Sequence, residues 1–355
     1  MRTWTTGFVA MLATLAGAAT AQAGPIPITS VTPAQLLADF NVIVSQNINN
    51  ANDIDGAVLA GGDLGTGIGP LNNKSIVLGT TAGTTAITGY GEINIFGNHT
   101  AAFNNTNGNV FVGGASSGTF PGATSVTFNY PFPPGATVAA NPTTFQNNIW
   151  TPLTNLSNHL GTLSANSTLS VDPTTHVGTF IGENGANIAI FSVPLSALNG
   201  LNGTLVFAGC LSSTNPGGPC DAVIDITGSG TLNNPSFAFP LVTGGFPNII
   251  VNFDNDVTVD VGNVWTASIL DPLGSVSSTT DITGNVVATN FTTTAETHLP
   301  GFNCSGNLCV CPPGTPGCSS APPIPTPEID AASGGAAIAL LLGVLALAGE
   351  RRRCS

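Results

Sequence analysis

Residues 249–261 read IIVNFDNDVTVDV, and this stretch decides the class of fold. It contains two largely apolar runs, 249–253 and 257–261, separated by Asp and Asn residues. Short apolar runs bounded by turn-forming residues are typical of β-strands. The stretch therefore predicts two strands joined by a turn.

Similar short runs recur along the chain, each bounded by Gly, Asn or Asp, whereas tight hairpin signals are few. Many short strands with few hairpins favour a mainly β fold of stacked coils, a β-solenoid or β-helix, over a sandwich. No fixed repeat period is present, so we expect an irregular solenoid. The other runs lie at 42–44, 58–60, 76–78, 93–96, 110–112, 167–171, 188–193, 205–208, 223–226 and 286–291.

One segment follows a helical period instead. Apolar residues three or four positions apart predict a helix over Thr144–Ala165, which Pro152 kinks or restarts. Burial of this stripe contributes on the order of 10 kcal/mol before entropy is subtracted, so we expect one long helix packed alongside the β body. Thr32 and Pro33 predict the start of a short helix. The stripe consists of residues 145, 149, 153, 156, 160 and 163.

The N-terminal segment has the features of a secretory signal peptide. Residues 1–23 contain one basic residue, an apolar stretch and the small-residue sequence Ala21-Gln22-Ala23. This pattern predicts a signal helix, with cleavage between Ala23 and Gly24.

The C-terminal tail has the features of a membrane anchor. Pro327 and Glu328 precede an apolar run of 19 residues, 331–349, and an arginine triplet follows it: Arg351, Arg352 and Arg353. As a helix this run is about 28 Å long, enough to cross the hydrocarbon core. The arginines favour the cytoplasmic side, so the body is expected outside the cell.

Charge limits the partners of the exported body. Between the two targeting segments Lys74 is the single Lys or Arg, while fifteen carboxylates give a net charge of −14. Nucleic acids and anionic lipids are excluded as partners, because their binding draws on Lys and Arg. Cations and neutral sugars remain.

The cysteine count suits an oxidising compartment. Six cysteines lie in the exported part, and disulfides are expected there. Cys210 and Cys220 flank one loop and are predicted to pair. Cys304, Cys309, Cys311 and Cys318 form a cluster with three possible pairings, and a zinc site is the competing interpretation. The sequence thus divides into 1–23 (signal peptide), 24–300 (β-solenoid domain), 301–326 (Cys- and Pro-rich stalk) and 327–355 (sorting signal).

The tail resembles the PEP-CTERM type of sorting signal, with Pro327-Glu328 as the motif. The resemblance implies a membrane protease of the exosortase type that cuts near this motif in a Gram-negative host. Ile329 stands where the common form has a second proline. The alternative is a plain anchor that is never cut.

The body resembles the choice-of-anchor A family of ice-binding-like adhesive domains over about residues 36–300. Three blocks carry the resemblance: 40–64, the helix at 144–165, and 249–298. It implies a β-solenoid with a helix alongside, Gly61-Gly62 in a turn between coils where φ > 0 or close approach needs glycine, and attachment to the cell surface. It supplies no catalytic residues.

Asp254, Asp256 and Asp260 form the densest group of carboxylates. In one strand they would share a face and could hold calcium weakly, although a solvated edge that discourages aggregation is the favoured interpretation. No other cofactor is indicated.

These observations favour a non-enzymatic surface or matrix protein, an adhesin that binds polysaccharide, cells or solid surfaces. Ice binding is the first alternative, because threonines gather at Thr80, Thr81, Thr84, Thr85 and 292–294, although no regular register is visible. A glycan hydrolase is the second, since it needs only two suitably spaced carboxylates.

Overall fold

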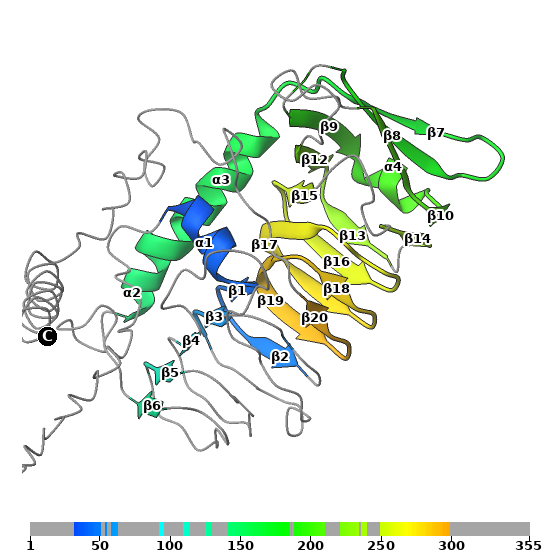
Figure 1. The fold of residues 1–355 in the computed structure, drawn as a ribbon. Coiled ribbons are helices and arrows are strands. Elements are labelled where there is room, and N and C mark those ends of the chain that lie inside the picture. Colours follow the sequence, from blue (N-terminus) through cyan, green and yellow to red (C-terminus); the bar gives the residue numbers. More distant parts are fainter. Residues whose placement is uncertain are drawn as a thin grey trace, which may run out of the picture.

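The computed structural model describes residues 32–50, 54, 58–62, 92–95, 109–113, 125–128, 141–184, 186, 188–209, 221–233, 236–239 and 249–298. In this part the chain is mainly β, and parallel strands of successive coils stack beside one long helix (Figure 1). The predicted mainly β fold is thus confirmed, and its parallel sheet is consistent with the predicted β-helix.

Ten strands form the first ladder, and every neighbouring pair in it is parallel. Its inward side chains are apolar and fully buried, for example Val42, Ile224 and Val251. From one end to the other the strands are β6 (Ser125–Phe128), β5 (Asn109–Val112), β4 (Glu92–Ile95), β3 (Val58–Ala60), β1 (Val42–Val44), β19 (Val286–Thr293), β17 (Ser268–Ser278), β15 (Ile249–Phe253), β12 (Asp221–Thr227) and β9 (Ile188–Pro194).

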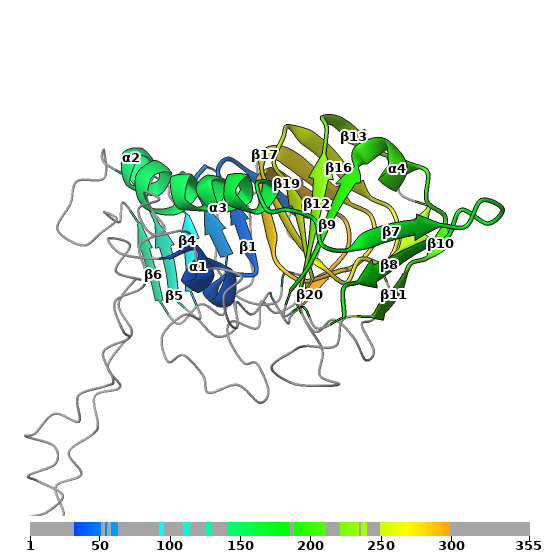
Figure 2. The same cartoon turned by 90° about the horizontal axis from the view of Figure 1, so that it is seen from above.

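The chain does not build this ladder from one end to the other. It starts in the middle at β1, adds strands outward to β6, and crosses along the helix to the opposite end at β9 (Figures 1 and 2). It then adds strands inward until β19 pairs with β1, Val286 opposite Val42. The first and last strands that the chain adds to this ladder are therefore neighbours.

A second ladder forms another side of the stack. It contains β2 (Ile48–Asn50), the second halves of β19 and β17, β16 (Val257–Val261) and β13 (Gly230–Leu232). Strand β17 serves both ladders because its register shifts between Asp271 and Ser275, which turns the corner.

Shorter pairs form the third side: β18 (Ile282–Thr283) with β20 (Thr297–His298), and β10 (Gly203–Thr204) with β14 (Phe237–Ala238). At the β9 end, β7 (Thr168–Val171), β8 (Gly178–Gly182) and β11 (Val206–Gly209) form a small sheet. Strands β7 and β8 are the one antiparallel pair among the described strands.

The long helix spans α2 (Asn141–Phe145), a π-helical turn η2 (Gln146–Trp150) and α3 (Thr151–Gly161). The predicted stripe is confirmed for Phe145, Ile149, Leu153, Leu156 and Leu160, which are at most 4% exposed. The sixth predicted member, residue 163, lies beyond the helix end and is only partly buried. The predicted bounds of 144 and 165 were wrong by three and four residues. The π turn, in which the Thr151 N–H donates to the Gln146 carbonyl, directly precedes Pro152, which has no N–H to continue an α-helical ladder.

Two local predictions at the N-terminus are confirmed. Helix α1 (Pro33–Asp39) begins at a capping box formed by Thr32 and Gln35. A Cβ on Gly61 would lie 2.5 Å from the Ser45 carbonyl oxygen, and one on Gly62 would lie 2.6 Å from that of Gln46. Close approach between coils therefore requires these glycines, and neither has a positive φ.

Several predicted features lie outside the described residues: the signal peptide with its cleavage site, the six cysteines, the stalk and the sorting tail. The structure therefore does not test them. Within the described residues no helix is long and apolar enough to cross a membrane.

A candidate binding face

The second ladder presents polar side chains on its outer surface. We call this surface the polar face. Each strand alternates, with an apolar residue inward and polar residues outward on both sides of it. The inward residues are at most 2% exposed. They are Leu232, Val259, Val276, Phe291 and Ile48.

The outward residues of the polar face form two in-register rows. Row one is Thr231, Thr258, Ser275 and Asn290, and row two is Asp260, Ser277, Thr292 and Asn49. Adjacent strands in a sheet lie about 4.8 Å apart, so each row repeats polar groups at that spacing. Asp260 is the one ionisable residue among these eight.

This register corrects the prediction that no regular spacing exists. Members of row one are 27, 17 and 15 residues apart in the sequence (231, 258, 275 and 290), because successive coils differ in length. Of the threonines that motivated ice binding, Thr292 lies in row two and Thr293 is buried. Thr80, Thr81, Thr84 and Thr85 lie outside the described residues.

Some of these polar groups bond to one another and others do not. The Ser277 hydroxyl donates to Asp260 at 3.0 Å, and the Asn290 amide donates to the Ser275 hydroxyl at 3.5 Å. The hydroxyls of Thr231, Thr258 and Thr292 have no hydrogen-bond partner among the described residues. They are available to a ligand.

A helix covers the outer side of the first ladder. Helix α3 packs over β12, β15 and β17 of the first ladder, where the Asn252 amide donates to the Ser157 carbonyl at 3.0 Å (Figure 2). The last described residue, His298, lies in β20 on the third side, so the chain towards the C-terminal tail begins there. No described helix or strand packs over the polar face.

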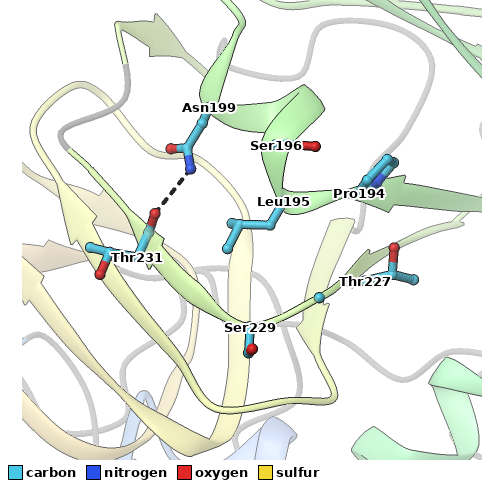
Figure 3. Close-up of a pocket in the computed structure, with 8 residues that line it drawn as sticks. Pro194, Leu195, Ser196, Asn199, Thr227, Ser229 and Thr231 are labelled. Carbon is cyan, nitrogen blue, oxygen red and sulfur yellow. Dashed lines mark hydrogen bonds between the residues drawn. The ribbon is translucent and has the colours of Figure 1, made fainter.

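A groove of about 560 Å³ lies at the β9 end of the polar face (Figure 3). We call it the end groove. Its walls come from the end of β9 with α4 (Leu195–Asn199) and from the turn between β12 and β13. Its lining residues are Pro194, Leu195, Ser196, Asn199, Thr227, Gly228, Ser229 and Thr231.

The predicted calcium candidates are not brought together. Asp254 and Asp256 lie in the corner between β15 and β16, whereas Asp260 lies within β16 on the polar face. The prediction that all three share one strand face was wrong, because the corner changes the direction of the chain. No group of three His, Cys, Asp or Glu residues suited to a metal ion occurs in the described part.

Two other carboxyl groups are buried, which the sequence did not indicate. Burial raises the pKa of Asp271 to about 8, opposed by the Gly274 N–H that donates to it and reinforced by Asp256. Burial also raises the pKa of Asp225 to about 6, opposed by the hydrogen bond from Asn252. Asp225 is buried beside Asn252 under α3, and Asp271 is buried at the corner of β17, so both serve the fold and not the polar face.

Parallel stacked coils, with a helix over one side and in-register polar rows on another, define a β-helix-like class of protein. The chain belongs to the ice-binding-like adhesive domain family, whose model matches residues 33–299. A VPEID-CTERM protein sorting domain matches residues 326–354. Together they identify an exported, adhesin-like cell-surface protein that is anchored transiently in the membrane before processing. No curated protein and no solved structure matches the chain.

The sorting match also explains why Ile329 stands where the common PEP-CTERM motif has a second proline. The sequence in that family's name places Ile and Asp after Pro-Glu, and this chain has Ile329 and Asp330 there. Thr326 stands in place of the valine.

Proposed function

We propose that the protein is a non-enzymatic adhesin that holds neutral polysaccharide against the cell surface through its polar face. The observation that carries this proposal is the pair of in-register polar rows on a side of the stack that no described helix covers. Hydroxyl and amide groups donate and accept hydrogen bonds without charge, as sugar hydroxyls do.

Charge supports a neutral ligand. The exported body has a net charge of −14, and the one ionisable residue in the two rows is the acidic Asp260. A polyanion would meet repulsion and no cation on this face. A neutral glycan is not repelled and does not need a cation.

A pull-down with the producer's own exopolysaccharide tests the proposal. Thr258→Val and Thr292→Val together remove two hydroxyls while keeping β-branched side chains, and we expect a loss of binding of about tenfold. Thr168→Val with Thr204→Val, on exposed strands elsewhere, is the matched control and should bind as the wild type does. Wild-type recovery no higher than that of an unrelated acidic protein would remove polysaccharide binding.

We further propose that an exosortase-type protease cuts near Pro327 and Glu328. The sorting match supports processing by a membrane protease of this general kind. Mass analysis of the secreted protein should show Gly24 at the start and an end near residue 327. Intact residues 331–355 on the surface form would show a plain anchor instead.

Ice binding is a second candidate, and the in-register hydroxyls favour it, because an ice surface is itself periodic. The expected result is thermal hysteresis above that of the Thr258→Val, Thr292→Val variant at equal concentration. A wild-type value equal to the buffer blank would leave adhesion to glycans as the function.

A further inference from the structure

Row one of the polar face leads directly into the end groove. Thr231, the last member of row one, is also a lining residue of the groove. We propose that the end groove is a separate subsite that holds the terminal sugar residue of a neutral glycan chain lying along row one. This inference rests on the proposed glycan binding and adds a second, end-specific site to it.

The groove offers hydroxyl groups that the protein does not use. Ser196, Ser229 and Thr231 have no side-chain hydrogen bond to any described residue. All three side chains are exposed. Serine and threonine hydroxyls each donate one hydrogen bond and accept two, so they match the hydroxyls of a sugar.

Asn199 differs from these residues because both ends of its side-chain amide form hydrogen bonds within the protein. Its amide donates to the Thr231 carbonyl at 2.9 Å, and its carbonyl oxygen accepts from the Asn233 N–H at 3.2 Å (Figure 3). These bonds tie α4 to β13 across the groove. Asn199 is therefore a positioning residue that fixes the distance between the two walls.

The rest of the lining is apolar or has no side chain. Leu195 is 7% exposed and lies at the base of the α4 wall, with Pro194 beside it. Gly228 has φ +100°, and no atom lies within 4 Å of a Cβ placed there, so the opposite wall is thin and open. Such a surface suits the C–H face of a sugar ring.

No charged residue lines the groove. Its volume of about 560 Å³ lies within the range of small-molecule sites, roughly 300–1,000 Å³. Because α4 packs against β13, the last strand of the polar face, the groove lies where row one ends and suits a chain end better than a chain interior. The chemistry therefore indicates a neutral, hydroxylated terminal residue.

The test uses the exported body with neutral hexasaccharides as probes: cellohexaose, maltohexaose and mannohexaose, with an alginate hexamer as the acidic comparison. Ser196→Ala with Ser229→Ala removes two groove hydroxyls and leaves row one intact. Ser170→Ala with Ser192→Ala, at exposed positions outside the groove, is the matched control. Titration calorimetry measures binding of each hexamer, and the pull-down measures binding of the long polysaccharide.

We expect at least one neutral hexamer to bind the wild type, the alginate hexamer not to bind, and the groove variant to lose about tenfold in hexamer affinity. The same variant should retain most of the binding to the long polysaccharide, because row one is unchanged. Asn199→Ala should also lower the affinity for the hexamer. Asn199→Asp keeps the oxygen that accepts from Asn233 but loses the amide donor, so its affinity should lie between those of Asn199→Ala and the wild type.

Equal hexamer affinity in the groove variant and the wild type would overturn the subsite. Polysaccharide binding by the wild type without hexamer binding would overturn it too, while leaving the proposed function in place. Failure of the wild type to bind either probe would reject both.

Discussion

Asn285 shows how a single buried side chain joins three elements. Its amide donates to the carbonyls of Leu37, at 2.8 Å, and Phe40, which end helix α1. Its oxygen accepts from the Ser268 hydroxyl of β17 at 3.1 Å, and its own N–H donates back to that hydroxyl. Because Asn285 is 1% exposed, water cannot replace these partners.

We therefore expect Asn285→Ala to lower the free energy of unfolding by at least about 2 kcal/mol, since it strands buried carbonyl groups. Asn255→Ala removes an exposed amide that contacts only its neighbour Asp254 among the described residues, and should change stability by less than about 0.5 kcal/mol. Denaturant melts of the two variants check the difference. Equal decreases in the free energy of unfolding would show that the hydrogen bonds of Asn285 do not stabilise the fold.

Asp271 lies fully buried at the corner of β17. Its Oδ1 accepts from the Gly274 N–H at 3.0 Å, while Oδ2 has no hydrogen-bond partner among the described residues. Burial raises its pKa from 3.8 to about 8, so the folded state keeps a proton that the unfolded state loses. Stability is therefore full below about pH 4 and falls as the pH rises towards 8.

The window from pH 6.5 to 8.5 isolates this group, because the pKa of Asp225 is raised only to about 6. In that window we expect the wild-type Tm to fall by about 3–5 °C. Asp271→Asn keeps the acceptor for Gly274 and cannot ionise, so its melting curve should be nearly flat. Parallel slopes for wild type and variant would show that Asp271 does not cause the pH dependence.

At the scale of elements, the long helix depends on packing and not on its own propensity. Its sequence is rich in Thr, Asn and Ser, which are modest helix formers, and Pro152 interrupts its backbone bonds. The buried stripe against β12, β15 and β17 compensates for both. The π turn before Pro152 lets the stripe continue across the interruption.

Leu156→Ala, at the fully buried centre of this stripe, should cost roughly 2–5 kcal/mol through the cavity that it leaves. Asn158→Ala lies on the exposed side of the same helix and should be neutral or slightly stabilising. Thermal melts measure both. A small effect of Leu156→Ala would mean that the helix contributes little to the domain.

At the scale of the molecule, β19 holds the two halves of the stack together. It pairs with β1 and β2 of the N-terminal half on one side and with β17 of the C-terminal half on the other. The ladder is therefore complete only when the last part of the domain is present.

A body that ends at Thr283 lacks β19 and β20, and we expect it to lose cooperative melting, because β1 and β17 lose their common neighbour. A body that ends at Pro300 should melt as one unit. Circular dichroism and limited proteolysis compare the two. A cooperative transition at an unchanged Tm in the shorter chain would contradict the role of β19.

The sequence by itself determined the features that depend on neighbouring residues or on composition. Apolar runs such as 249–253 and 257–261 matched β15 and β16, and the stripe from Phe145 to Leu160 matched the helix. Both family resemblances were also confirmed. These signals are local, so one segment of chain is enough to reveal them.

Only the tertiary structure decided which residues meet. Thr231, Thr258, Ser275 and Asn290 form one row although unequal intervals separate them, because loops of different length connect coils that stack in register. The same stacking separated Asp254 from Asp260, buried Asp271, and set β19 beside β1. Register between coils depends on backbone hydrogen bonds between distant segments, and no sequence period records it.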